Sequence, residues 1–360
     1  MTLFYLCGSG NVPYGGVRVM YRHVDILNRA GIPASIVHDV SEFRCTWFEN
    51  STQVAQLPLE ATDRDVLVIP ETWSGLLTSL APGIPKVSFN QNAFYATQRY
   101  SLRDHPYLVA KDLLASMTVS EQNLELLEYV FPRTKFRRVR LSIDQTMFHL
   151  PDEPPGRRIA YMTRKRAAES NMVLDILRAR DVLREWDVVV IDRLNESGVA
   201  RTLRSASLFL SFSQYEGLPL SPLEALASGC AVIGYTGFGA REYFETLGAV
   251  EVQDGDFVSF AHEVEAWIRK FEADEEWPAA KSRSERCLVA YSPEGEAEDV
   301  LAFWTEVLSQ MPESRGTTCT IAKRDIRKGS WQLILRHSAP MLRAGFGKVL
   351  GVVTSPSLDR

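Results

Sequence analysis

The sequence predicts an α/β protein built from two open, mostly parallel sheets. Residues 207–235 have the pattern of a strand, a loop, a helix and a second strand, which is the repeating unit of such sheets. Residues 3–38 show the same order, with a Gly-rich loop at the first turn, as in nucleotide-binding folds. Between them, the Pro-rich and charged stretch 151–158 predicts a linker. A chain of 360 residues with 45% hydrophobic residues can bury two cores of ordinary size.

Short apolar runs mark the strands that we expect in the first half of the chain. They have the length of buried parallel strands and lie at 3–7, 34–38, 66–70, 86–90 and 117–120. A helix is expected between the first two runs, because Gly31 ends a stretch whose apolar face consists of Val19, Met20, His23, Val24, Leu27 and Ala30. A second helix is expected after Ser120, whose hydroxyl can cap it.

The second half repeats this alternation and ends with a longer helix. Its strands are expected at 158–162, 187–192, 207–212 and 230–235. A short helix follows Pro222 and ends at Gly229. Residues 293–311 have the amphipathic pattern of the longer helix.

The loop at residues 217–220 has the features of an anion site. It leads from the carboxyl end of a strand into a helix, so unpaired backbone N–H groups and the positive end of the helix dipole face outward. Gly217 lets a ligand approach the backbone closely. Glu216 precedes the loop, and Glu224 lies about one turn into the helix, where a carboxylate can reach a ribose diol. The spacing equally allows Glu216 to be a solvated loop residue and Glu224 a charge favoured by the helix dipole.

One long motif narrows these alternatives. The stretch EGLPLSPLEALASGCAVIGYTGFGAREYF, residues 216–244, resembles the signature of the retaining family-4 glycosyltransferases (glycosyl transferases group 1) of the GT-B fold. Two departures are small. Cys230-Ala231 replaces the usual pair before the strand, and Phe238 stands before Gly239 where the family usually has two adjacent glycines. The resemblance implies two Rossmann-like domains that face a central cleft, with a C-terminal helix that crosses back to the first domain.

The resemblance also implies a division of the chain. Residues 1–150 would form an acceptor-side domain, and residues 151–292 a domain for the nucleotide-sugar donor. Residues 293–312 would be the crossover helix, which leaves 313–360 as a basic extension. Within the second domain, 196–205 and 250–253 resemble a short helix and a small strand of the family.

The same resemblance assigns roles to individual residues. Arg164 and Lys165 would bind the donor diphosphate, with Arg166 able to replace either. The diphosphate would then fit the anion site of the loop, at Gly217, Leu218, Pro219 and Leu220. Glu216 would hold sugar hydroxyls and Glu224 the ribose.

In the first domain, Gly15 and Gly16 match the glycine loop that closes over the donor phosphates. The Gly-Gly pair could also form an ordinary tight turn. Where the family often has a His that faces the sugar, this chain has Asn90, Gln91 and Asn92. Gln91 or Asn92 could therefore orient the sugar through hydrogen bonds that do not titrate, or cap the next segment instead.

The activity that follows is metal-independent, retaining transfer of a sugar from a nucleoside-diphosphate sugar to a glycan or lipid-linked acceptor, in cell-surface polysaccharide or glycolipid synthesis. No cofactor is expected. The alternative is a GT-B-shaped scaffold or binding subunit that has lost activity, and a GT-B sugar epimerase is a third interpretation. The presence of Glu216, Glu224, Arg164 and Lys165 favours the transferase.

Composition excludes several other classes. The net charge of −5 gives no reason to expect a nucleic-acid partner. Five scattered cysteines favour buried thiols in a reducing compartment over disulfides. We expect no signal peptide and no spanning helix, hence a cytoplasmic protein, possible also at the inner face of a membrane. Two D-x-D triplets, at 63–65 and 254–256, are rejected as metal sites, because the first precedes its strand and the second lies in a turn.

The basic extension 313–360 has two interpretations. Cations alternate there with apolar residues, which is typical of a segment that binds an anionic membrane surface. The competing interpretation is that the apolar residues pack on the first domain while the cations face water. The residues concerned are Lys323, Arg324, Arg327, Lys328, Trp331, Leu335, Arg336, Leu342, Arg343, Phe346 and Lys348.

Overall fold

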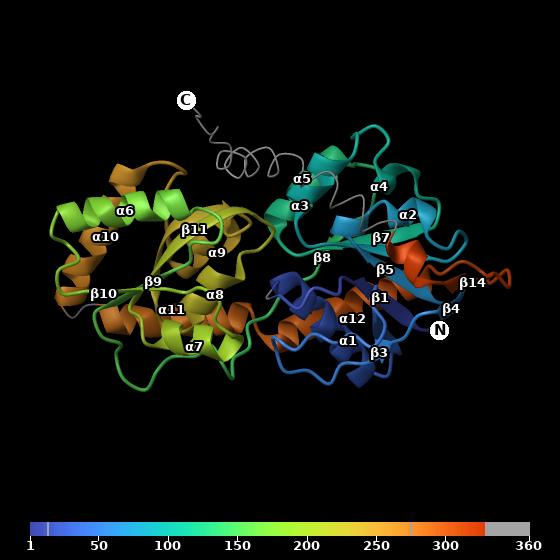
Figure 1. The fold of residues 1–360 in the computed structure, drawn as a ribbon, viewed down its shortest axis with the longest axis horizontal. Coiled ribbons are helices and arrows are strands. Elements are labelled where there is room, and N and C mark those ends of the chain that lie inside the picture. Colours follow the sequence, from blue (N-terminus) through green and yellow to red (C-terminus); the bar gives the residue numbers. More distant parts are fainter. Residues whose placement is uncertain (13, 274–275, 328–360) are drawn as a thin grey trace, which may run out of the picture.

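The computed structural model describes residues 1–12, 14–273 and 276–327, and contains two parallel sheets that lie side by side (Figure 1). The first sheet has seven strands in the order β3-β2-β1-β5-β6-β7-β8, all paired in parallel. Its strands are β1 (Leu3–Cys7), β2 (Ala34–His38), β3 (Val54–Ala55), β5 (Val66–Pro70), β6 (Lys86–Asn90), β7 (Leu113–Thr118) and β8 (Phe136–Arg138).

Helices cover both faces of the first sheet. Alternate residues of a strand point to opposite faces, so Tyr5 packs under α1 (Gly15–Arg29) while Phe4 and Leu6 pack with the helices opposite. Those helices are α2 (Leu76–Ser79), α3 (Ala93–Arg99), α4 (Pro106–Val109) and α5 (Glu121–Val130), with the 3₁₀ turn η1 (Glu71–Trp73). The predicted cap of α5 is present, since the Ser120 hydroxyl accepts a hydrogen bond from the Asn123 N–H at 3.1 Å.

The second sheet is smaller and follows the same plan. Its order is β10-β9-β11-β12-β13, again parallel. One face packs against α6 (Ala167–Ala179) and α10 (Phe257–Glu272). The remaining elements of this half are β9 (Arg158–Tyr161), β10 (Asp187–Val190), α7 (Glu196–Arg204), β11 (Leu208–Glu216), α8 (Leu220–Ala227), β12 (Ala231–Phe238), α9 (Arg241–Leu247), β13 (Val250–Glu251) and α11 (Glu276–Ala290).

The long helix α12 (Pro293–Ser309) returns to the first sheet and lies beside α1 (Figure 1). Buried Trp304 donates from its indole N–H to the hydroxyl of Tyr5 at 2.9 Å. Glu296 is fully buried, accepts from the Ser142 hydroxyl at 2.6 Å and pairs with Arg22 of α1 at 2.6 Å. These contacts confirm the crossover that the GT-B resemblance implied.

After α12 the chain packs on the first domain. Strand β14 (Thr318–Ile321) pairs antiparallel with β4 (Leu59–Thr62), and the side chains of Ile321 and Ile326 are buried in the core beside α2. The start of the basic extension, up to Arg327, is therefore part of the fold. Its other named residues, from Lys328 to Lys348, lie outside the described residues.

No helix among the described residues is long and apolar enough to cross a membrane. The thiols of Cys7, Cys45, Cys230 and Cys287 are buried and free, and Cys319 is free and half-buried.

Candidate active site

The loop between β11 and α8 lies at the seam between the two sheets. The helix begins at Leu220, and its N-cap residue, Pro219, gives no side-chain hydrogen bond to the first turn. The loop is packed against the first domain, because a Cβ added to Gly217 would lie 1.7 Å from the carbonyl oxygen of Gln91. Gly217 is thus required by the close approach of a second stretch of backbone as well as by any ligand.

Glu216 faces Lys165 across neighbouring strands. Lys165 follows β9 and Glu216 ends β11, and these neighbouring parallel strands have their carboxyl ends at one edge of the sheet. The Lys165 ammonium lies 2.5 Å from a carboxylate oxygen of Glu216 and donates to the Gln214 carbonyl at 2.9 Å. Their side chains keep 29% and 26% of their surface exposed, so a ligand can reach the pair.

The three contiguous cations separate in the structure. Arg164 is exposed, with its guanidinium 5.8 Å from the ring centre of Tyr14, which belongs to the first domain. Arg166 points the other way and is buried, where it pairs with Glu169 and Asp254 and lies 4.8 Å from the ring centre of Tyr235. The expectation that Arg166 could replace its neighbours is therefore wrong, because its guanidinium is committed to the second domain.

Glu224 lies in α8, buried, and pairs with an arginine that the sequence analysis missed. The Arg18 guanidinium of α1 donates to Glu224 at 2.8 Å and also pairs with Glu196 of α7. Arg18 thus joins the first turn of α1 to two helices of the second domain. Its place two residues after Gly16 was the one signal available, since the first turn of α1 borders the predicted glycine loop.

The first-domain residues proposed for the site meet the loop across the seam. The Gln91 side-chain amide donates to the Gly16 carbonyl at 3.0 Å, and a Cβ added to Gly15 would lie 3.1 Å from the Leu220 side chain. Asn92 caps α3 by accepting from the Phe94 N–H at 3.1 Å, and donates to the Tyr215 carbonyl at 2.8 Å.

Ser120 is a second residue that sequence reasoning did not place here. Besides capping α5, its hydroxyl donates to the Gly217 carbonyl at 2.7 Å. The predicted residues of both domains therefore converge on one seam, around residues 217–220.

Comparison with known proteins finds one matching family. Residues 177–282, which include Glu216 and Glu224, match the model of "Glycosyl transferases group 1". The chain is 26% identical over 281 residues to an alpha-1,6-glucosyltransferase of Actinobacillus pleuropneumoniae serotype 7 (strain AP76), covering 72% of this chain and 81% of that protein. Both matches support a glycosyltransferase of group 1.

Solved structures agree on the fold of this glycosyltransferase. A glycosyltransferase from Rickettsia africae has a TM-score of 0.60 at 11% identity, over 86% of this chain and 99% of that one. HepE of Anabaena in complex with UDP-glucose has a TM-score of 0.60 at 10% identity, over 85% and 100%. Sucrose-phosphate synthase from Thermosynechococcus elongatus has a TM-score of 0.58 at 12% identity, over 86% and 99%. The architecture is GT-B.

The acidic triplets of the glycosyltransferase have structural roles. Asp63 accepts hydrogen bonds from Ser314 and from the N–H groups of Arg315 and Thr317, which lowers the pKa of its carboxyl. Asp254 pairs with Arg166, and Asp256 caps α10 by accepting from the Ser259 N–H at 2.9 Å. The described residues contain no group of His, Cys, Asp and Glu that could hold a metal ion.

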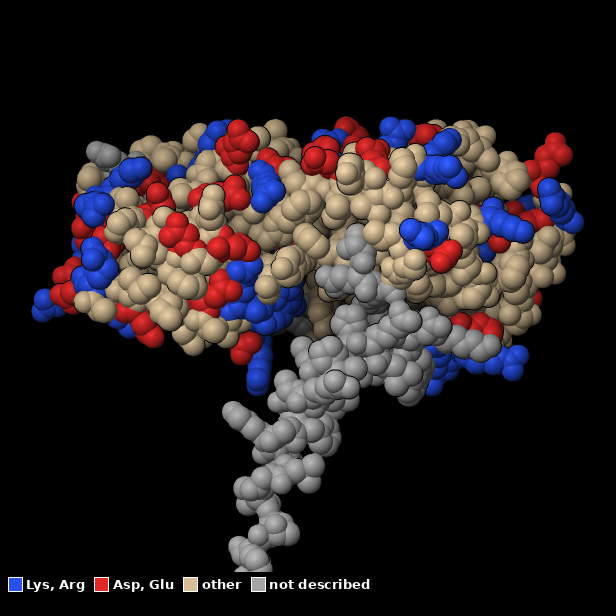
Figure 2. Space-filling model, turned by 90° about the horizontal axis from the view of Figure 1, so that it is seen from above, with Lys and Arg blue, Asp and Glu red and all other residues tan. Residues whose placement is uncertain are grey.

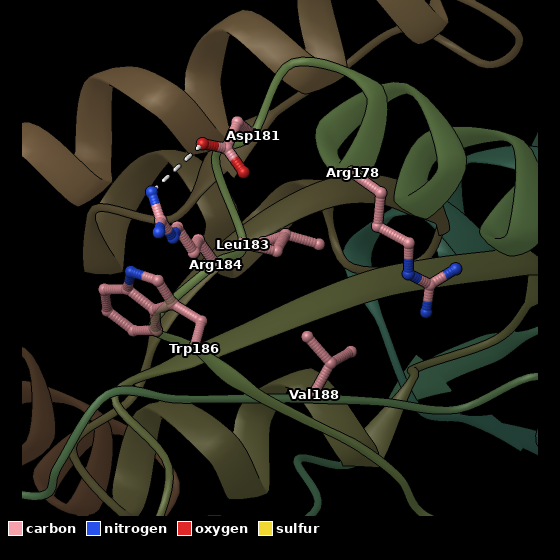
Figure 3. A pocket seen from close by; sticks show the side chains of 6 residues that line it. All are labelled: Arg178, Asp181, Leu183, Arg184, Trp186 and Val188. Atoms are coloured by element: carbon pink, nitrogen blue, oxygen red, sulfur yellow. Dashed lines mark ion pairs between the residues drawn. The ribbon is translucent and has the colours of Figure 1, made fainter.

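A separate hollow of about 340 Å³ lies at the outer edge strand β10 (Figure 3). It contains none of the predicted site residues and is lined by Arg178, Asp181, Leu183, Arg184, Trp186 and Val188. The predicted residues gather at the other end of the sheet, around the carboxyl ends of β9 and β11, so the candidate active site is the seam and not this hollow.

Proposed function

We propose that this glycosyltransferase moves a sugar, with retention of configuration, from a nucleoside-diphosphate sugar to a glycan or lipid-linked acceptor. The observation that carries the proposal is the Lys165–Glu216 pair, which lies at the entrance of the loop that leads into α8. A cation for the diphosphate and a carboxylate for the sugar hydroxyls are there in direct contact.

The donor diphosphate would pair with the Lys165 ammonium, so that the Glu216 carboxylate could bind the sugar. Ion pairs that stay partly exposed contribute only about 0–1 kcal/mol, so Lys165 can exchange partners readily. With Lys165 and Arg164 on the phosphates, Glu216 is free to accept hydrogen bonds from the sugar. The N–H groups that begin α8 would add further donors to the phosphate oxygens.

Departure of the nucleoside diphosphate would then be the step that the site accelerates. Negative charge accumulates on the leaving phosphate oxygens as the sugar gains oxocarbenium character, so fixed donors stabilise the transition state more than the ground state. A double-displacement glycosidase needs a carboxylate free to attack the sugar. Here Glu216 would hold the sugar hydroxyls and Glu224 the ribose, so neither would serve as the nucleophile. We therefore propose attack from the face that the diphosphate leaves, with the leaving phosphate as the base.

The relatives indicate which donor to test first. The Actinobacillus relative is named as an alpha-1,6-glucosyltransferase, and HepE of Anabaena was solved with UDP-glucose. We propose UDP-glucose as the donor, Glu224 as the ribose ligand after release from Arg18, and Gln91 or Asn92 as contacts of the transferred or accepting sugar. Activity would need no metal.

The test is release of UDP from UDP-glucose in excess EDTA, with a mixture of glycoside acceptors. We expect turnover by the wild-type protein and a loss of about 100-fold or more in Glu216→Ala, because the lost carboxylate acts in the transition state. The variant should keep the wild-type melting temperature. Equal turnover in a folded Glu216→Ala protein would contradict the role of Glu216. No nucleotide binding by the wild type, with any donor, would favour the inactive scaffold.

A further inference from the structure

Two bulky residues beside Glu216 have a backbone conformation that favours glycine. Tyr215 has φ +48° and Phe238 has φ +81°. They end neighbouring strands, since Glu216 is in register with Phe238, and the register shifts between Ser213 and Glu216. Bulky side chains rarely adopt such angles, and residues held in them cluster at functional sites.

The two strained residues share one aromatic neighbour from the other domain. The ring of Phe94, in α3, lies 5.1 Å from that of Tyr215 and 5.2 Å from that of Phe238, centre to centre. We call Phe94, Tyr215 and Phe238 the aromatic rim. Asn92 fixes its position by donating to the Tyr215 carbonyl at 2.8 Å.

Packing alone does not explain the rim. Tyr215 keeps 56% of its surface exposed, so its ring is not needed to fill the core. A glycine would adopt the same backbone angles without strain. A bulky ring that is both strained and exposed suggests selection for contact with a ligand.

We propose that the aromatic rim binds the pyranose ring of the acceptor sugar, which stacks on Tyr215. The face of an aromatic ring carries partial negative charge, and the axial C–H groups of a pyranose carry partial positive charge. This inference rests on the proposed function, in which Glu216 holds the donor sugar. Tyr215 directly precedes Glu216 and is 56% exposed, so we propose that a sugar on the rim lies beside the donor sugar.

The experiment measures transfer from UDP-glucose to methyl glycosides of glucose, galactose and N-acetylglucosamine by the full-length protein. Tyr215→Gly should raise the KM for the accepted glycoside about five- to tenfold, the size expected for loss of one aromatic contact. Its affinity for UDP and its hydrolysis of UDP-glucose should stay within about twofold of wild type. Tyr215→Phe keeps the ring and should behave as wild type.

Two controls separate stacking from a structural role. Tyr215→Gly removes backbone strain, so its melting temperature should equal or exceed that of the wild type. Tyr129→Ala removes a tyrosine that is 87% exposed on α5 and should leave every constant unchanged.

Three results would overturn the proposal. One is an acceptor KM that is the same in wild type and Tyr215→Gly. Another is a loss of UDP affinity in Tyr215→Gly as large as the rise in its acceptor KM, which would assign Tyr215 to the donor. The third is wild-type protein that hydrolyses UDP-glucose but transfers to none of the three glycosides. Failure of the proposed function itself looks different, because the wild type would then neither bind UDP nor hydrolyse UDP-glucose.

Discussion

At the scale of single residues, the seam is organised by contacts that leave no room for larger side chains. Gly217 is the tightest point, where the loop before α8 touches the backbone of Gln91. The polar contacts around it, from Ser120 to Gly217 and from Asn92 to Tyr215, all cross between the domains. Substitutions at these contacts should change both the distance between the two domains and the turnover of the enzyme.

Gly217→Ala tests this point. The added Cβ would lie 1.7 Å from a backbone oxygen, which cannot rotate away, so the loop or the domains must shift. We expect turnover to fall about 100-fold, the size seen when reacting groups are misplaced by about 1 Å. Gly156→Ala is the matched control, because an added Cβ there meets nothing within 4 Å. Equal turnover in both variants would show that the seam tolerates displacement.

The sequence could predict where a residue lies in the fold when its place at the end of a strand determines that position. Lys165 and Glu216 were both expected at the donor site, and the structure brings them together at 2.5 Å because β9 and β11 are neighbouring parallel strands. The direction of each side chain could not be predicted, so Arg166 looked equivalent to Lys165 although it is buried against Glu169. Arg18 was missed because its contact with Glu224 depends on how one domain packs on the other.

At the scale of elements, strands and helices with strong local patterns were predicted and their long-range pairing was not. The apolar runs at 3–7 and 66–70 correspond to β1 and β5 with the same bounds. The pairing of β14 with β4 had no local signal, since neither strand is a continuous apolar run and they lie far apart in the sequence. Hydrophobic periodicity reports local burial and carries no information about such partners.

Helix α12 is held on the first domain by a buried charge, which makes its stability depend on pH. Burial alone would raise the pKa of Glu296, but Arg22, His23 and Ser142 outweigh it and lower that pKa to about 2. The ordinary value is about 4.3. The native state therefore holds its carboxylate charged where the unfolded chain would protonate it, so this stabilisation is complete above the unfolded pKa and is lost as pH falls toward 2.

Glu296→Gln should lower the free energy of unfolding at pH 7 by about 3 kcal/mol, because Arg22 loses its buried partner. The difference from wild type should shrink as pH falls from about 4.3 toward 2, where the wild-type carboxylate is also neutral. Urea unfolding between pH 7 and 3 measures it. Glu298→Gln, on the same helix with 78% of its side chain exposed, should match wild type throughout. A difference that does not change with pH would contradict the ion-pair account.

At the scale of the whole molecule, charges of both signs lie on the face shown in Figure 2. Basic and acidic side chains occur over both domains there, and a group of basic ones gathers near the middle of the face. If the acceptor is carried by a lipid, as we propose, the basic residues beyond Arg327 are the first candidates for attraction to an anionic membrane. Those residues include Lys328, Arg336, Arg343 and Lys348.

Truncation after Arg327 tests this without removing β14 or Ile326 from the first domain. We expect the full-length protein to sediment with anionic vesicles and the truncated protein to stay in the supernatant. Added salt should weaken the binding, because charges are screened over about 8–10 Å near physiological ionic strength. Neutral vesicles are the control. If both proteins remain equally in the supernatant, the membrane interpretation is wrong.

The central claim is that Arg164, Lys165 and the loop at 217–220 form the site for the donor diphosphate, and calorimetric titration with UDP tests it most directly. The double variant Arg164→Ala/Lys165→Ala should lose about 3 kcal/mol of binding free energy, since charged hydrogen bonds contribute about 1.5–3 kcal/mol each. The matched control is Arg178→Ala/Arg184→Ala, which removes two exposed arginines from the hollow at β10. The account predicts that this control binds UDP as wild type does. Unchanged affinity in the first variant, or an equal loss in both, would contradict it.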